Sequence, residues 1–169
     1  SATRDRIVDD HPAVAASLNN LASLYKRQGR YEQAEPLYVH ALDSSRKLLG
    51  DDHPNVATSL NDLAGLYESQ GRYDQAEPLY VQALDLYRKL LGDDHPDVAT
   101  SLNNLAFLYE SRGRYDQAES LYMQAITILS NRLGQDHPNT RTVFNNFRQF
   151  VATVLEAKQQ NQLSDHPLT

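Results

Sequence analysis

Residues 51–92 read DDHPNVATSLNDLAGLYESQGRYDQAEPLYVQALDLYRKLLG, and the same pattern returns along the chain with a period of 42 residues. Asp-His-Pro stands at 10–12, 52–54, 94–96 and 136–138, and Gly-Arg-Tyr stands at 29–31, 71–73 and 113–115. A fixed period of this length is typical of a solenoid, in which each unit buries its apolar face against its neighbours. The repeat therefore predicts the fold class before any single element is considered.

Each unit predicts two helices. Within the quoted stretch, apolar residues follow the i, i+3, i+4, i+7 spacing of an amphipathic helix at Leu60, Leu63, Ala64 and Tyr67. Pro54 suits the first position of that helix and Gly71 suits its end. The pattern predicts first helices over 12–28, 54–70 and 96–112, and second helices over 31–49, 73–91 and 115–133. The three repeats then cover residues 11–50, 51–92 and 93–134.

The two ends depart from the repeat. Residues 138–158 resemble a first helix that contains three of the four phenylalanines, and Arg148 stands where the repeats have a small alanine. A long charged side chain there predicts that no second helix packs closely on it, so we interpret 138–158 as a capping helix. The repeat domain would span 11–158. Residues 1–10 align with the end of a preceding second helix or form a disordered lead-in, and the polar residues 159–169 are expected to be a mobile tail.

Composition excludes several function classes. The 169 residues carry a net charge of −6 with mixed acidic and basic side chains, whereas a nucleic-acid or anionic-membrane binder needs clustered Lys and Arg. The chain has no cysteine, which rules out disulfides and thiolate metal sites and is compatible with a reducing cytoplasm, the location that we expect. We therefore expect no nucleic-acid and no membrane partner.

The repeat resembles a known family. The spacing of the quoted unit is similar to that of the tetratricopeptide repeat, and its longer 42-residue form resembles the repeats of kinesin light chains and their bacterial relatives. This resemblance implies an all-α, right-handed solenoid of three helical hairpins plus the capping helix, with a concave groove lined by the first helices. It also implies a scaffold that binds a protein or extended peptide, without enzymatic activity and without a cofactor, and it favours a bacterial origin.

The candidate binding residues lie on the face of each first helix that is offset from the apolar stripe. Asparagines recur there in a ladder, and an asparagine side chain can pair with both backbone groups of an extended peptide. The ladder and the variable columns beside it comprise Asn19, Ser23, Lys26, Asn61, Asp62, Glu68, Asn103, Asn104, Phe107, Glu110, Asn145 and Gln149. The alternative is that these asparagines bond to a neighbouring helix and set the spacing between repeats.

Other readings of the sequence remain open or weak. The repeated histidines at 11, 53, 95 and 137 lie one repeat apart, too far for one metal ion, so each is expected to cap or pack the link between repeats. No catalytic or phosphate-binding motif is present in the sequence. The chain could instead be an accessory repeat domain of a larger signalling ATPase or enzyme. It could also be a self-associating structural module, either a monomer or weakly associated through an exposed N-terminal face.

Overall fold

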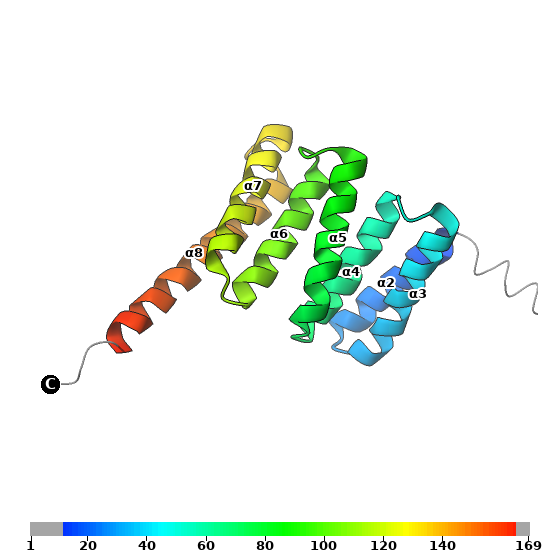
Figure 1. Ribbon diagram of the computed structural model, residues 1–169, viewed down its shortest axis with the longest axis horizontal. Coiled ribbons are helices and arrows are strands. Elements are labelled where there is room, and N and C mark those ends of the chain that lie inside the picture. Colours follow the sequence, from blue (N-terminus) through cyan, green and yellow to red (C-terminus); the bar gives the residue numbers. More distant parts are fainter. Residues whose placement is uncertain (1–11, 165–169) are drawn as a thin grey trace, which may run out of the picture.

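The computed structural model describes residues 12–164, and it is helical throughout apart from short turns. The elements are α2 (Pro12–Arg27), α3 (Tyr31–Leu49), α4 (Pro54–Ser69), α5 (Tyr73–Leu91), α6 (Pro96–Ser111), α7 (Tyr115–Leu133) and α8 (Pro138–Ser164). The hairpins stand side by side in chain order, from α2 to α8 (Figure 1). Each helix packs on its neighbours in sequence, and α4 also contacts α2 and α6. The predicted all-α solenoid of three hairpins and a cap is confirmed.

Histidine side chains cap the helices that begin each repeat. The His53 Nδ1 atom accepts a hydrogen bond from the backbone N–H of Asn55 at 3.1 Å, directly before Pro54 enters the helix. His95 and His137 accept the equivalent bonds at 3.1 and 3.2 Å. A helix start has unpaired N–H groups, so this bond stabilises the link between repeats. The expected capping role is confirmed at these three positions, and His11 lies outside the described residues.

Small and aromatic side chains form one continuous core. Ala64 and Ala106 are completely buried, which lets the two helices of a hairpin approach closely. Tyr80 and Tyr122 fill the same position in successive second helices and are also buried. These core residues therefore have the same environment as their equivalents one period away. The core runs through the stack without a break between repeats.

A cluster that we call the arginine clamp joins neighbouring repeats on the side of the turns. The Arg72 guanidinium lies 4.2 Å from the centre of the Tyr67 ring and donates to the Glu35 carboxylate of the preceding repeat at 2.7 Å. Arg114, Tyr109 and Glu77 repeat this arrangement at 4.0 and 2.7 Å. Stacking and a charge-assisted hydrogen bond together fix the angle between one hairpin and the next.

The capping helix packs through aromatic contacts and is longer than predicted. The Phe150 ring lies 5.4 Å from that of Tyr122 on α7. The helix does not end at residue 158 but continues to Ser164, so residues 159–164 are helical rather than a mobile tail. The repeats end at a glycine, which is absent here, and nothing else in the sequence stops the helix. The predicted features of residues 1–10 and 165–169 lie outside the described residues.

Candidate functional site

The predicted binding residues lie on α2, α4, α6 and α8, on a surface that we call the first-helix face. The structure places them as a band across these four helices, with Asn104, Phe107 and Glu110 on α6 and Asn145 and Gln149 on α8. Phe107 is 50 % exposed, and Asn145 and Gln149 are exposed. The first-helix face is therefore mainly polar, with one large apolar side chain near its centre.

The asparagine ladder makes bonds between neighbouring first helices. The Asn61 Nδ2 atom donates to the Ser101 Oγ atom of α6 at 3.0 Å, and Asn19 Nδ2 donates to Ser59 Oγ of α4 at 3.3 Å. Asn103 uses its carbonyl oxygen instead, accepting from Asn146 Nδ2 of α8 at 3.0 Å. These contacts give the asparagines the structural role that was the alternative to peptide binding. Asn145 makes no such bond to another described first helix.

Two of these asparagines keep an unused acceptor. The Oδ1 atoms of Asn19 and Asn61 are buried, and neither has a hydrogen-bond partner among the described residues. The Oε1 atom of Glu68 is in the same state. Buried polar atoms are usually paired, and each unpaired one costs on the order of 1–3 kcal/mol. The first-helix face therefore holds three buried acceptor oxygens without a partner among the described residues.

A group of three charged side chains lies around Gly65 on this face. A Cβ atom built on Gly65 would lie 2.9 Å from the Lys26 Nζ atom, so the ammonium group rests directly on the glycine backbone. Burial raises the pKa of Asp62 and of Glu68, although Lys26 opposes both shifts. Burial also lowers the pKa of Lys26, against the attraction of the two carboxylates. All three groups are thus poorly hydrated. For each of them, the effect of burial on the pKa is larger than the opposing effect of the neighbouring charges.

Tyrosine hydroxyls from the second helices reach the same face, which the sequence did not predict. Tyr80 donates to Glu68 Oε2 at 2.8 Å, and Tyr122 donates to Glu110 Oε2 at 3.0 Å. Burial and the adjacent carboxylate raise the pKa of each tyrosine. The signal was present as a glutamate and a tyrosine twelve residues apart in two repeats.

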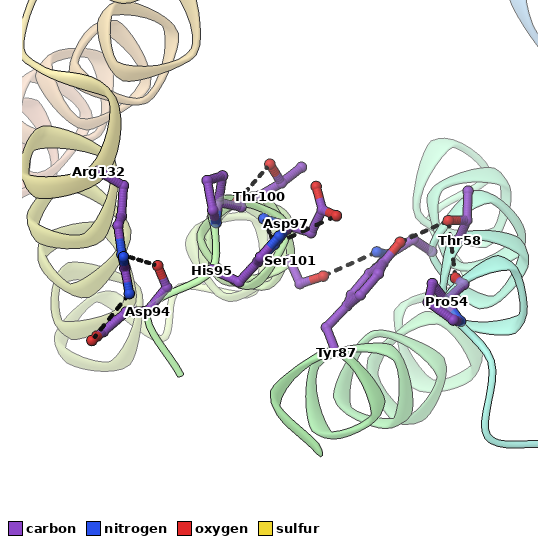
Figure 2. Close-up of polar contacts among 11 residues, drawn as sticks. Pro54, Thr58, Tyr87, Asp94, His95, Asp97, Thr100, Ser101 and Arg132 are labelled. Carbon is purple, nitrogen blue, oxygen red and sulfur yellow. Dashed lines mark hydrogen bonds and ion pairs between the residues drawn. The ribbon is translucent and has the colours of Figure 1, made fainter. Parts of the chain in front are cut away.

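A cavity of about 250 Å³ opens between the first two repeats. Its polar lining includes Asn19, Asn20, Thr58 and Asp62, and its apolar lining includes Leu48. The Thr58 Oγ1 atom is hydrogen-bonded to the hydroxyl of Tyr87 on α5, at 2.7 Å (Figure 2). The cavity is large enough for one amino-acid side chain.

The first-helix face also bonds to the loop between repeats. Figure 2 shows Thr100 and Ser101 on α6 beside the cap formed by His95, with Arg132 of α7 reaching the loop at Asp94. The Arg132 Nε atom donates to the Asp94 carbonyl oxygen at 3.2 Å. The start of α6 is therefore held from both sides, by the His95 cap and by Arg132.

Residues 12–164 contain no group of three or more His, Asp or Glu side chains placed to hold a metal ion. Among the same residues, the helices are too short or too polar to cross a membrane.

Comparisons with known proteins add a family and a set of related folds. The family model described as "Tetratricopeptide repeat" matches residues 13–89, 61–131 and 97–147, which together span more than half of the chain. No curated protein sequence matches.

Several solved structures share the fold. A putative kinesin light chain with nearly identical TPR-like repeats from Podosopora anserina superposes with a TM-score of 0.72 at 24 % identity, covering 94 % of this chain and 79 % of that one. BtubC (BKLC) from P. vanneervenii gives 0.69 at 28 % identity, covering 94 % and 68 %. The first TPR domain of human RPAP3 gives 0.61 at 16 % identity, covering 88 % and 98 %.

Proposed function

This chain belongs to the tetratricopeptide repeat family, and from that premise we propose that it binds a partner protein or an extended peptide on the first-helix face. Tetratricopeptide domains generally mediate protein–protein interactions, and the family is typically a non-catalytic scaffold. A scaffold fold does not name its ligand, so the proposal depends on the properties of the surface. We place this interaction in the cytoplasm, in keeping with the absence of cysteine.

The observation that carries the proposal is the exposed Phe107 on a face that also holds incompletely paired polar groups. Phe107 is 50 % exposed, whereas its neighbours Leu105 and Leu108 on the same helix are buried in the core. Packing of the repeats does not require a phenylalanine there, because Gly65 fills the equivalent position one repeat earlier. A large aromatic side chain in a polar surround is a typical anchor for a partner.

The polar groups of α4, on the same face, favour a ligand that brings hydrogen-bond donors. Glu68 and Asn61 each hold an unpaired acceptor oxygen, and Asp62 is a desolvated carboxylate. An extended peptide presents backbone N–H groups at regular intervals, and small side-chain rotations would let these acceptors reach them. In this proposal Asn61 has two roles, because its amide nitrogen bonds to Ser101 and its oxygen remains for the ligand.

The test uses a phage-displayed library of random peptides, selected on the immobilised wild-type chain. Phe107→Ala is compared with Met123→Ala, its matched control, because Met123 is also a large apolar residue with 48 % exposure but lies on α7. We expect selected peptides to lose binding to Phe107→Ala and to retain it with Met123→Ala. Peptides that bind both variants equally would place the interaction on another surface, and the proposal would then be wrong.

A second candidate function, self-association, is favoured by one observation. Leu21 and Leu24 on α2 are 41 % and 42 % exposed, whereas Leu63 and Leu66, their equivalents on α4, are at most 5 % exposed. In the inner repeats a preceding second helix covers this apolar face. We propose that a second copy of the chain can cover it on α2. Sedimentation equilibrium of wild type and Leu24→Ser tests this: a wild-type chain that stays monomeric at high concentration would exclude it.

A further inference from the structure

A second pocket lies far from Phe107, between the start of α7 and the second half of α8. It is a cavity of about 310 Å³. The apolar wall is formed mainly by α8, through Phe150, Val151, Val154 and Leu155. Two carboxylates of α7, Asp116 and Glu119, stand at its edge with Lys158. Because α8 runs on past the start of α7 (Figure 1), this wall is incompletely covered, and Leu155 is 55 % exposed.

The chain itself shows what these carboxylates bind. Glu119 and Asp116 stand 42 residues after Glu77 and Asp74 and occupy the same positions at the start of a second helix. Glu77 accepts hydrogen bonds from Arg114 at 2.7 Å and from Arg112 at 2.8 Å. Asp74 forms an ion pair with Arg112 at 2.9 Å. Glu35, one repeat earlier, holds Arg72 in the same way. In both repeats the glutamate of this arrangement holds a guanidinium group.

In the last unit the arginines are missing. Val154 and Glu156 occupy the positions of Arg112 and Arg114, and α8 continues as a helix where the repeats turn at a glycine. Within residues 12–164, no basic side chain forms an ion pair with Asp116 or Glu119. The clamp position thus keeps its carboxylates but lacks its arginines, and it also lacks the tyrosine ring on which an arginine stacks, since Val151 occupies the position of Tyr109. Lys158 lines the pocket but does not replace the arginines in an ion pair.

Arg148, on the same helix α8, limits the size of a ligand that this pocket can bind. Arg148 occupies the position of Ala106, which is completely buried where the two helices of a hairpin meet. The exposed Arg148 side chain would separate α8 from any helix laid along its whole length. A ligand can therefore cover only the half of α8 that follows Arg148. That half accommodates a short segment and not a complete second helix.

We propose that this pocket binds a short arginine-containing segment of a partner protein. The guanidinium group lies between Glu119 and Asp116, as Arg112 lies between Glu77 and Asp74. An apolar side chain next to the arginine covers Val151 and Leu155. This pocket is separate from the first-helix face. The proposal that the pocket binds arginine and the proposal that the first-helix face binds a peptide can therefore be tested independently.

The probe is the chain's own clamp segment, residues 111–118, as the acetylated and amidated peptide SRGRYDQA. A peptide with both arginines replaced by glutamine is the control ligand. Binding is followed by amide chemical shifts of the isotope-labelled full chain. The protein variants are Glu119→Gln and its matched control Glu32→Gln, which removes the same charge from an exposed position in the first turn of α3.

We expect saturable shifts confined to residues 115–119 and 150–158. Glu119→Gln should weaken binding about tenfold, the loss of one charge-assisted hydrogen bond, and Glu32→Gln should bind as wild type does. The glutamine peptide, which lacks both guanidinium groups, should bind at least about tenfold more weakly than the arginine peptide. Glu119 is exposed, so its variant should melt like wild type by circular dichroism. The proposal is overturned if the peptide causes no saturable shift, if Glu119→Gln binds as tightly as wild type, or if the shifts fall around Phe107.

Discussion

Replacing Asn61 by alanine separates the structural role of the asparagine ladder from its proposed role in binding. The substitution removes the hydrogen bond from Asn61 Nδ2 to Ser101 Oγ, and Ser101 is completely buried. Loss of a buried hydrogen bond costs on the order of 1–3 kcal/mol when the partner is left unsatisfied. The substitution also removes the unpaired Asn61 Oδ1 atom, which offsets part of that cost. We therefore expect the free energy of unfolding to fall by about 1 kcal/mol.

The assay is thermal and urea unfolding of wild type, Asn61→Ala, Ser101→Ala and the double variant. A loss of about 1 kcal/mol corresponds to a midpoint roughly 2–4 °C lower for a domain of this size. If the side chains interact as the structure shows, the double variant should be less destabilised than the sum of the single variants, by about 0.5–1.5 kcal/mol. An Asn61→Ala variant as stable as wild type, with additive effects in the double variant, would refute the structural role.

Three further predictions concern other repeated positions. Gly65→Ala should raise the free energy of unfolding by up to about 1 kcal/mol, because alanine favours a helix and only the mobile end of Lys26 must move; a lower melting temperature would contradict this. The hydrogen bond from Arg72 lowers the pKa of Glu35, so this group stabilises the fold above its unfolded pKa and loses that effect as pH falls through its folded pKa. Glu35→Gln should therefore flatten the acid limb of a pH–stability curve, and an unchanged limb would argue against the clamp. His95→Ala should cost about 1 kcal/mol by chemical denaturation through loss of the helix cap, and His95→Asp should restore most of it; equal stability of all three proteins would exclude the cap.

The sequence predicted the helices closely because each is bounded by residues with strong local preferences. Pro54 and Gly71 mark the ends of one first helix, and the second helices were predicted with the bounds that the structure has. Local preference also explains the error at α8. The prediction ended at residue 158, where the apolar pattern stops, but a helix needs a specific stop signal and none is present before Ser164.

The candidate site was harder to predict because its contacts depend on how successive repeats are oriented. Nothing near Asn61 in the sequence indicates that its amide reaches Ser101, forty residues later. The proximity of Lys26 to Gly65 has the same origin, since it requires α2 and α4 to cross at a particular angle. The periodic pattern identifies which residues share a face. It does not specify the distances between faces, on which hydrogen bonding depends.

The side-chain bonds between repeats join residues that lie about one period apart or closer, and this has a consequence for how the chain opens. The bond from Asn61 to Ser101 spans 40 residues, and the clamp from Arg72 to Glu35 spans 37. No described helix packs on one more than a single repeat away. Unfolding can therefore stop at the boundary of any hairpin, since the remaining hairpins keep every contact that they make with one another. Amide hydrogens should exchange fastest in the outer helices and slowest in α4, α5 and α6. The stack would then unfold progressively, hairpin by hairpin, starting at its two ends.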